Sequence, residues 1–454
     1  MKGEKMSETK KLPQKGLGHY EIQDRLIAFE RASHFATFER NLFDEGPHLT
    51  SSPSLPWGDA IRERVVQAWV RFMHGEIWHT GVGARQMERE VISMMGAMFG
   101  NPEAVGFITS GGSESDICAL IAAKGRAFCK RYPEVDRSKI ESTYDVVFRI
   151  PEFEKESRSI VMPYHSHYSL YKGCAMLGLE AIPVSPIEGT YYKINPDDIR
   201  AAIREDTIGI VGTAATWPFG TIDPIEEMGK IAEEYDLYFH VDACFGGFII
   251  PFLERSGYYD PPLAPWDFRV PSVCSISADL HKNGMVPPPA SSLYFRNAGM
   301  KNYARLFAPP FGAVSGTRAT GPIAASWTML MSLGIEGYTA ISRHTIRLQE
   351  QLNKAISKIP GLKVLPDSKI NLSVIYSEKY DLRPVVKALA EQEWCVSSHD
   401  VPPPVGICIC CMPQNDGQID AFVAVLEEQL KLHGVPIGSL GEDYEFSLYG
   451  LDLD

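Results

Sequence analysis

The spacing of apolar residues predicts that the chain begins with helices. Apolar positions recur every three or four residues over 20–45 and again over 58–100, where Ile61 and Val65 begin the series, and this period is that of an amphipathic helix. The stretch between them, 47–56, is rich in Ser and Pro, which interrupt regular structure. We therefore expect two helical regions joined by a loop ahead of the first strand.

From 105 to 295 the pattern changes to short β-branched runs that alternate with amphipathic segments. This alternation is typical of βαβ units and predicts an α/β domain with a mostly parallel central sheet. Asp223 and Pro224 are expected to open one crossover helix, with the carboxylate as its cap. The expected strands are Val105–Thr109, Ser159–Met162, Ala181–Val184, Ile208–Gly212, Tyr238–Val241, Ser272–Ser277 and Ser291–Phe295.

Helix and strand signals repeat on a smaller scale over 335–435, which indicates a second, small α+β domain. The tail after Gly441 is acidic and only weakly periodic. The sequence therefore predicts three parts. They are an N-terminal helical segment (1–84), a large domain (85–330) and a small C-terminal α+β domain with the acidic tail (331–454).

Composition and charge narrow the class of protein. Of the 454 residues, 44% are apolar and 22% are charged, which is ordinary for a globular protein and excludes fibrous and disordered chains. A net charge of −13 without a basic stripe argues against nucleic acid as a partner. No run approaches the ~18 apolar residues of a membrane span. The nine cysteines are too sparse for a disulfide framework, so we expect a cytoplasmic protein.

Four polar segments follow predicted strands, at the sheet edge where α/β proteins bind their ligands. In the first, Ser110, Gly111, Gly112 and Ser113 precede an apolar helix. Two glycines let the backbone approach an anion, and the first N–H groups of the helix complete a phosphate cradle. A plain strand-to-helix turn with a serine cap is the alternative interpretation.

The other three segments carry a lysine, a carboxylate and flat rings. Lys282 follows a strand, and burial favours the neutral amine with which a lysine attacks carbonyls. Asp242 ends a hydrophobic strand, where a carboxylate needs a cationic partner. His165 and His167 place rings near the same edge. An anion cradle, an aldehyde-seeking lysine, a buried carboxylate and a planar ring together meet the needs of pyridoxal phosphate.

The order of these segments resembles the group II pyridoxal-phosphate-dependent decarboxylase superfamily of fold type I, and most of all its sphingosine-1-phosphate lyase branch. The resemblance rests on His240–Phe248 (HVDACFGGF), Ser275–Lys282 (SISADLHK) and Pro218–Pro224 (PFGTIDP), and it covers roughly residues 55–430. It implies pyridoxal 5'-phosphate as cofactor and the fold of the fold type I transferases. It also implies a homodimer with shared active sites, in which the N-terminal helical segment 1–84 packs across the dimer.

The resemblance further implies roles for individual residues. Lys282 carries the cofactor as an internal aldimine, Asp242 pairs with the pyridinium nitrogen, and His167 stacks on the ring. Thr213 is a further candidate cofactor contact, with a capping hydroxyl as the alternative. The residues implied to hold the cofactor phosphate or to lie near it are Gly111, Gly112, Ser113, Ser277, His281 and, across the dimer, Arg318.

Departures from the lyase branch bear on the reaction. That branch grips its substrate's phosphate with a tyrosine, an asparagine three residues before a histidine, and a lysine shortly after the Schiff-base lysine. The matching segments here read Pro56–Asp59, Glu76–His79 and Pro287–Ala290. Only His79 remains, and Glu76 would repel a phosphate. We therefore expect an L-amino acid α-decarboxylase that forms CO₂ and an amine through an external aldimine and a quinonoid. Aldehyde-lyase chemistry is the alternative.

Other interpretations stay open at this point. Tyr303 is a candidate substrate-binding residue that could supply a proton, with a packing tyrosine as the alternative. A thiol cluster at Cys408, Cys410 and Cys411 is disfavoured against a buried strand, and a scaffold without catalysis is disfavoured because Lys282 and Asp242 are both present. A metal site is disfavoured because no helical His-x-x-x-His spacing supports it. Its ligands would come from His165, His167, His240, Asp242, Asp279 and His281.

Overall fold

The computed structural model describes residues 59–77, 81–134, 150–309, 312–392, 394, 396–441, 444 and 446. All of them belong to one compact unit, which runs from Pro47 to Asp454. The helix expected over 20–45 and the candidate residue His79 lie outside the described residues.

The large domain is built on a seven-stranded sheet with the order β1-β7-β6-β5-β4-β2-β3. β7 is antiparallel to both of its neighbours, and the other neighbouring pairs are parallel. This confirms the predicted mostly parallel sheet, with each predicted strand within one residue of its expected bounds. The strands are β1 (Val105–Thr109), β2 (Ser159–Pro163), β3 (Glu180–Val184), β4 (Thr207–Thr213), β5 (Tyr238–Asp242), β6 (Val273–Ala278) and β7 (Ser291–Phe295).

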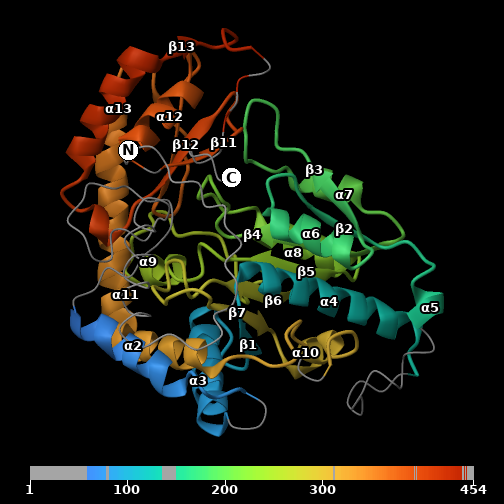
Figure 1. Ribbon diagram of the computed structural model, residues 1–454. Coiled ribbons are helices and arrows are strands. Elements are labelled where there is room, and N and C mark those ends of the chain that lie inside the picture. Colours follow the sequence, from blue (N-terminus) through green and yellow to red (C-terminus); the bar gives the residue numbers. More distant parts are fainter. Residues whose placement is uncertain are drawn as a thin grey trace, which may run out of the picture. The chain divides into compact units, whose positions relative to one another are not determined.

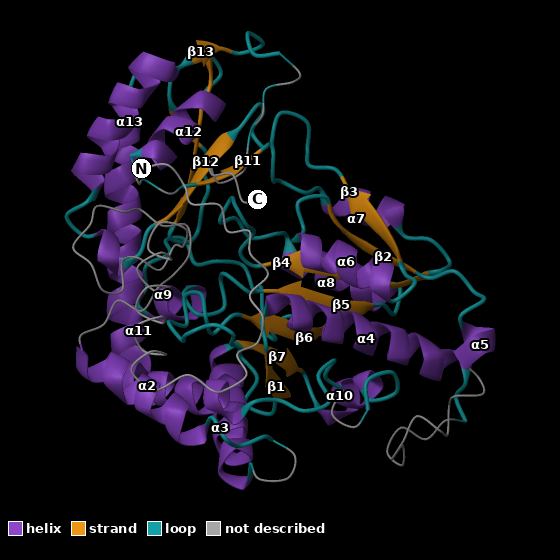
Figure 2. Ribbon diagram, in the orientation of Figure 1, coloured by secondary structure: helices purple, strands orange, loops and turns teal. Residues whose placement is uncertain are grey.

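Alternate residues of the strands face two separate helix layers, as the period of a strand requires. Phe107, Met162 and Tyr238 pack against α4 and α6, which Figure 2 shows on one face of the sheet. Ile108 and Phe239 pack on the other face, which α3, α7 and α8 cover. The helices are α2 (Asp59–Phe72), α3 (Val82–Met98), α4 (Gly112–Arg131), α5 (Ile150–Phe153), α6 (Tyr168–Met176), α7 (Pro196–Ala202), α8 (Ile225–Glu234), α9 (Ile250–Arg255) and α10 (Ala298–Ala304).

The single helical region expected over 58–100 is wrong in one respect, because it is interrupted between α2 and α3. The N–H of Gly75 donates to the carbonyl of Phe72 in a turn, and Glu76 then forms an isolated β-bridge with Ala319. The chain thus leaves the helix to pair with a distant extended segment.

The C-terminal part forms a four-stranded sheet with the order β11-β12-β9-β8. Figure 1 shows it beside α12 and α13. The long helix α11 packs against α2 and also against β9 of this sheet. None of the helices in the described ranges is both long and apolar enough to cross a membrane. The elements are α11 (Thr320–Ile356), β8 (Lys363–Val364), β9 (Leu372–Tyr376), β10 (Tyr380–Asp381), α12 (Arg383–Glu391), β11 (Ser397–His399), β12 (Gly406–Cys410), α13 (Ile419–His433) and β13 (Val435–Pro436).

Candidate active site

The carboxyl ends of β1, β4, β5 and β6 meet at a cavity of about 340 Å³. Parallel strands end at the same edge of a sheet, so residues that are far apart in the sequence come together there. The sequence-predicted site residues that line this cavity are Gly111, Gly112, Ser113, His167, Thr213, Asp242, His281 and Lys282.

Lys282 is held by a carboxylate and an aromatic face. Its Nζ lies 2.8 Å from Oδ2 of Asp279 and 4.3 Å from the ring centroid of Phe245. Its side chain keeps 21% exposure, toward the cavity. Burial alone would lower the pKa of Lys282, but the nearby carboxylates, Asp279 foremost, raise its pKa above the ordinary value. Before any cofactor is attached, Lys282 is therefore held as an ammonium ion, and not as the neutral amine that burial alone would favour.

The glycine segment and His281 form one wall of the cavity. Gly111 is the residue before α4, and Gly112 and Ser113 begin that helix, so their N–H groups have no acceptor within the helix. A Cβ on Gly112 would lie 2.7 Å from Sγ of Cys244 and 3.0 Å from the carboxylate oxygens of Asp279. His281 is fixed beside them, because its Nδ1 accepts the N–H of Ala290 at 3.1 Å. These positions suit an anion at the helix N-terminus.

Asp242 ends β5 at the floor of the cavity. Its Oδ1 accepts the N–H of Cys244 at 2.9 Å, and the hydroxyl of Ser277 lies 3.4 Å from the same atom. Burial raises the pKa of Asp242, and the charge of Asp116 raises it further. A cation bound in the cavity would offset the free-energy cost of burying a charged Asp242 carboxylate.

His167 lies directly before α6, and its Nδ1 faces the first turn of that helix. Its Nδ1 lies 2.7 Å from Oγ of Ser169, and its ring lies 4.1 Å from that of Tyr168, centroid to centroid. Burial and the charge of Lys282 lower the pKa of His167. The imidazole is thus neutral near pH 7.

Asp223 is not the helix cap that the sequence predicts. α8 begins after Pro224 without a side-chain cap. The Asp223 carboxylate instead accepts the N–H of Thr213 at 2.8 Å and lies 3.0 Å from Nε2 of His165. The end of β4 and the His165 side chain each take one oxygen of this carboxylate. These groups are buried away from water, so leaving them without an acceptor would cost more than leaving the helix uncapped.

Asp116 lines the cavity, although sequence reasoning gave it no role, and so does His165, which the sequence placed as a ring at this sheet edge. Asp116 lies on α4 and is 1% exposed. The signal for it was a carboxylate between the serine and glycine segment and the apolar run 117–123. A buried carboxylate on a sheet-covering helix is costly unless a network of donors holds it.

The remaining candidates lie elsewhere. Ser277 is buried beneath the floor and donates to Asp116. Arg318 lines an adjoining cavity of about 190 Å³, which shares Ser110 and Glu114 with the first. Tyr303 is on α10, where its backbone would meet a Cβ on Gly125, and it packs against the apolar cluster of α4. The roles of Arg318 and Tyr303 toward the cofactor and the substrate stay predictions.

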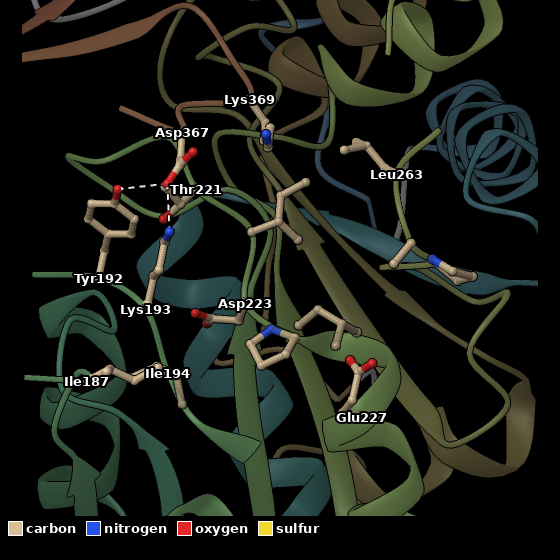
Figure 3. Close-up of a pocket in the computed structure, with 15 residues that line it drawn as sticks. Ile187, Tyr192, Lys193, Ile194, Thr221, Asp223, Glu227, Leu263, Asp367 and Lys369 are labelled. Carbon is tan, nitrogen blue, oxygen red and sulfur yellow. Dashed lines mark hydrogen bonds and ion pairs between the residues drawn. The ribbon is translucent and has the colours of Figure 1, made fainter. Parts of the chain in front are cut away.

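A second cavity, of about 450 Å³, lies behind Asp223. Figure 3 shows Tyr192 and Lys193 pointing toward Asp367 at its rim. Asp223 lines this cavity while its partner His165 lines the first. The His165–Asp223 pair therefore stands in the wall between the two.

The six-residue metal set considered from the sequence does not assemble. Within the described residues, the group with ligand atoms within 4.8 Å of one another is Asp116, Asp242 and Cys244. Burial raises the pKa of the Cys244 thiol well above its ordinary value, so the thiolate that a metal prefers is disfavoured. Cys408 and Cys410 lie in β12, and Cys411 directly follows it. All three are fully buried and form no disulfide, as expected for a core strand.

The residues present fit pyridoxal phosphate. The donor set matches each part of the cofactor: helix N–H groups for the phosphate, a lysine for the aldehyde and a buried carboxylate for the ring nitrogen. Oγ1 of Thr213 and Nδ1 of His165 are buried without a hydrogen-bond partner among the described residues, and both residues line the cavity. Such orphaned polar atoms indicate a polar ligand.

Comparison with known proteins agrees with this geometry. Residues 78–376 match the family described as the pyridoxal-dependent decarboxylase conserved domain. The chain is 30% identical over 413 residues to sphingosine-1-phosphate lyase 1 of Rattus norvegicus, which covers 88% of this chain and 66% of the rat protein, just under two thirds.

Two further proteins show the same likeness over most of their own length. The L-aspartate decarboxylase of Thermococcus kodakarensis is 30% identical over 370 residues, which cover 80% of this chain and 87% of that protein. The solved sphingosine-1-phosphate lyase of Burkholderia pseudomallei superposes with a TM-score of 0.79 at 25% identity, over 94% of this chain and 93% of that one.

Proposed function

Since this chain belongs to the pyridoxal-dependent decarboxylase family, and so is a pyridoxal-phosphate-dependent lyase, we propose that it is an L-amino acid α-decarboxylase. Such an enzyme removes the α-carboxyl group as CO₂ and leaves an amine. The named lyase and decarboxylase relatives are equally similar to it, at 30% identity. The choice between their reactions therefore rests on the pocket.

The charge of the pocket lining carries the proposal. The carboxylates of Glu114, Asp116, Asp242 and Asp279 line the cavity, whereas Lys282 is the single lysine or arginine among its described lining residues. A substrate that brings its own phosphate would meet these carboxylates without a second cation to pair with it. An amino acid substrate carries no such dianion.

The guanidinium that lines the adjoining cavity is already engaged. Arg318 forms an ion pair with both oxygens of Glu88 and donates to the carbonyl of Ile108 at 2.7 Å. Both side chains are largely buried, and breaking such a pair would leave an uncompensated charge. Arg318 is therefore a poor candidate for gripping a substrate phosphate.

Four residues of the cavity have roles in this proposal. When bound, pyridoxal phosphate supplies the electron-withdrawing ring that the cleavage of a Cα bond requires. Lys282 would provide the amine that attaches the cofactor, and Asp242 would hold a proton at the ring nitrogen. Trp217 and Phe245, which stack at 4.8 Å, exclude water from the side of the cavity that they line.

We further propose a homodimer in the cytoplasm. Val66, Val70 and Met73 form one face of α2 and its end, and each is about half exposed, which supports a covering surface from a second copy. The buried thiols of Cys118, Cys174, Cys244, Cys274, Cys408, Cys410 and Cys411 form no disulfide, which supports a reducing compartment. A fully active monomer in light scattering at assay concentration would overturn the dimer.

The decisive experiment compares the two reactions side by side. The enzyme reconstituted with pyridoxal phosphate is incubated with a panel of small, acidic and aromatic L-amino acids, and separately with a phosphorylated sphingoid base. Release of CO₂ and the matching amine from an amino acid supports the proposal. Efficient formation of a long-chain aldehyde and phosphoethanolamine, with no amine from any amino acid, overturns it.

That second outcome would establish the aldehyde-lyase alternative. It is kept because the solved Burkholderia pseudomallei lyase matches nearly the whole chain.

A further inference from the structure

Asp116 is the centre of a buried hydrogen-bond network beneath the cavity. Its Oδ2 accepts the hydroxyl of Ser169 at 2.6 Å, and its Oδ1 accepts the hydroxyl of Ser277 at 2.9 Å. Nε2 of His240 lies 3.4 Å from the same Oδ1. A carboxylate is the strongest acceptor in this group, so both serine protons point to it.

The direction of the Ser169 proton decides the protonation of the next group. Ser169 has one hydroxyl proton, and Asp116 receives it. The same oxygen lies 2.7 Å from Nδ1 of His167, where it can then only accept. The proton of that hydrogen bond must therefore sit on Nδ1.

A second contact of Nδ1 favours the other tautomer, but it is the weaker of the two. The main-chain N–H of Ser169 lies 3.3 Å from Nδ1 of His167 and would require an unprotonated Nδ1. This contact is longer by 0.6 Å than the one to the hydroxyl, and hydrogen bonds weaken steeply with distance. Because Asp116 takes the hydroxyl proton of Ser169, Nδ1 of His167 donates to that hydroxyl and does not accept the main-chain N–H.

We propose that Asp116, acting through Ser169, is a positioning residue that fixes the proton of the His167 imidazole on Nδ1 and leaves Nε2 as a hydrogen-bond acceptor. Nothing in the family match or in the named relatives assigns this role. The inference rests on the proposed place of His167 in the active site, which lines the cavity. Within the described residues, the imidazole hydrogen-bonds through Nδ1, so Nε2 is left for a group in the cavity.

The charges around His167 keep the ring in the neutral form that has tautomers. Burial and the charges of Lys282 and Lys172 lower its pKa, and the charges of Asp242 and Asp279 raise it less. Near pH 7 the ring therefore carries one proton, and the network determines which nitrogen holds it.

The same carboxylate joins His167 to the floor of the cavity. Ser277, which donates to Asp116, lies 3.4 Å from Oδ1 of Asp242. Asp116 also raises the pKa of Asp242 through its charge. One buried side chain thus orients the group proposed to face the cofactor ring and adjusts the group proposed to pair with its nitrogen.

The test reads the tautomer directly in the enzyme without cofactor or substrate. Protein labelled with ¹⁵N at its 12 histidines is studied by NMR near pH 7, and a His167→Gln variant identifies the His167 signals. The parent should show a protonated Nδ1 and an unprotonated Nε2. Because no substrate is present, the result does not depend on which reaction the enzyme catalyses.

Two variants that alter different atoms should reverse the tautomer. In Ser169→Ala only the main-chain N–H remains beside Nδ1, so the proton should move to Nε2. In Asp116→Ala the Ser169 hydroxyl loses its acceptor and should turn to donate to Nδ1, with the same result. Ser373→Ala is the matched control, because it removes a buried hydroxyl that donates to Asn353 at 2.6 Å, far along the chain in β9. It should leave the signals unchanged.

The outcomes are distinct. A proton on Nε2 in the parent, or a proton that stays on Nδ1 in Ser169→Ala, overturns the proposal, even if Asp116→Ala does not fold. In the reconstituted enzyme, Ser169→Ala should lower kcat about tenfold, which is the scale of one oriented hydrogen bond, with KM within about twofold. A loss confined to KM would contradict the positioning role.

Discussion

The ammonium of Lys282 and the carboxylate of Asp279 form a close ion pair, with Nζ 2.8 Å from Oδ2. The two residues are three apart, in the turn that follows β6, and Asp279 is 1% exposed. Burial raises the pKa of Asp279, but the charges of Lys282 and His281 outweigh this and bring its pKa below the ordinary value. The pair therefore holds the lysine in the protonated form, which does not attack an aldehyde.

The first prediction concerns how fast the cofactor attaches. In Asp279→Asn the pKa of Lys282 should fall, because an adjacent opposite charge typically shifts a pKa by about 1–3 units. The rate at which apoenzyme takes up pyridoxal phosphate should then reach its maximum at a pH lower by at least about one unit. Stopped-flow absorbance over a range of pH measures this shift.

The control for that measurement is Asp267→Asn. Asp267 is equally buried and pairs with Arg269 at 2.7 Å, but it does not line the cavity. It should leave the pH profile in place. An unchanged profile in Asp279→Asn would show that the ion pair does not set the basicity of Lys282.

The second prediction identifies the attaching lysine. Lys282→Ala should lose the adduct that borohydride traps with pyridoxal phosphate, and turnover should fall by several orders of magnitude. Lys301→Ala is the sharp control, because burial lowers the pKa of Lys301 and makes it the competing candidate for a neutral amine. The Lys301→Ala variant should still form the borohydride-trapped adduct, as mass spectrometry of the modified peptide would show. A fully active Lys282→Ala enzyme would reject the assignment.

The third prediction tests the glycine cradle. A Cβ on Gly112 would lie 3.0 Å from both oxygens of Asp279 and still closer to Cys244. Gly112→Ala should therefore displace these side chains and weaken binding of pyridoxal phosphate by tenfold or more, a difference of about 1.4 kcal/mol. Equilibrium dialysis measures it. Gly83→Ala, early in α3, meets only an ordinary 3.8 Å contact with Phe72 and should bind the cofactor normally.

Much of the fold and of the pocket could be predicted because local pattern and global architecture agree here. β-branched runs of five to seven residues became the strands of the sheet, and parallel strands bring their carboxyl ends to one edge. Lys282, Asp242 and Gly112 therefore meet at one cavity, although 170 residues separate the first from the last. Strand order alone accounts for that meeting.

The hydrogen-bond partners of the buried carboxylates could not be predicted from the sequence. The serine hydroxyls that hold Asp116 lie on α6 and β6, at sequence separations of 53 and 161. Asp223 satisfies the local rule for a helix cap, but its carboxylate turns to Thr213 and His165. Such choices depend on which donors lack water in the folded protein, and no local pattern records this.

The fourth prediction follows from this difference. Asp223→Ala should destabilise the apoenzyme by about 3 kcal/mol, because it leaves a buried N–H and a buried imidazole without their charged acceptor. A lost helix cap costs only about 1 kcal/mol. Asn195→Ala supplies that reference, since Asn195 caps α7 through the N–H of Asp197. Urea denaturation compares the two, and equal losses would restore the capping role of Asp223.

The last prediction sets stability against activity at Asp242. Burial and the charge of Asp116 raise the pKa of Asp242, so the folded apoenzyme holds this proton more tightly than the unfolded chain does. As pH rises above about 4, the ordinary range of an aspartate, the unfolded chain releases its proton first and the stability of the fold decreases. Once the pH exceeds the raised pKa, the full cost of the buried charge persists.

Asp242→Asn removes that cost while keeping the acceptor for the N–H of Cys244, which lies 2.9 Å from Oδ1. The variant apoenzyme should therefore melt at a higher temperature than the parent at pH 7, by about 1–3 °C, and the difference should shrink toward pH 4. Turnover should fall by orders of magnitude, because an amide cannot hold the proton on the ring nitrogen. Calorimetry of apoenzyme at both pH values, beside an activity assay, checks the pair of effects. A variant that is less stable at pH 7, or one with normal turnover, would show that the buried charge is not kept for the cofactor.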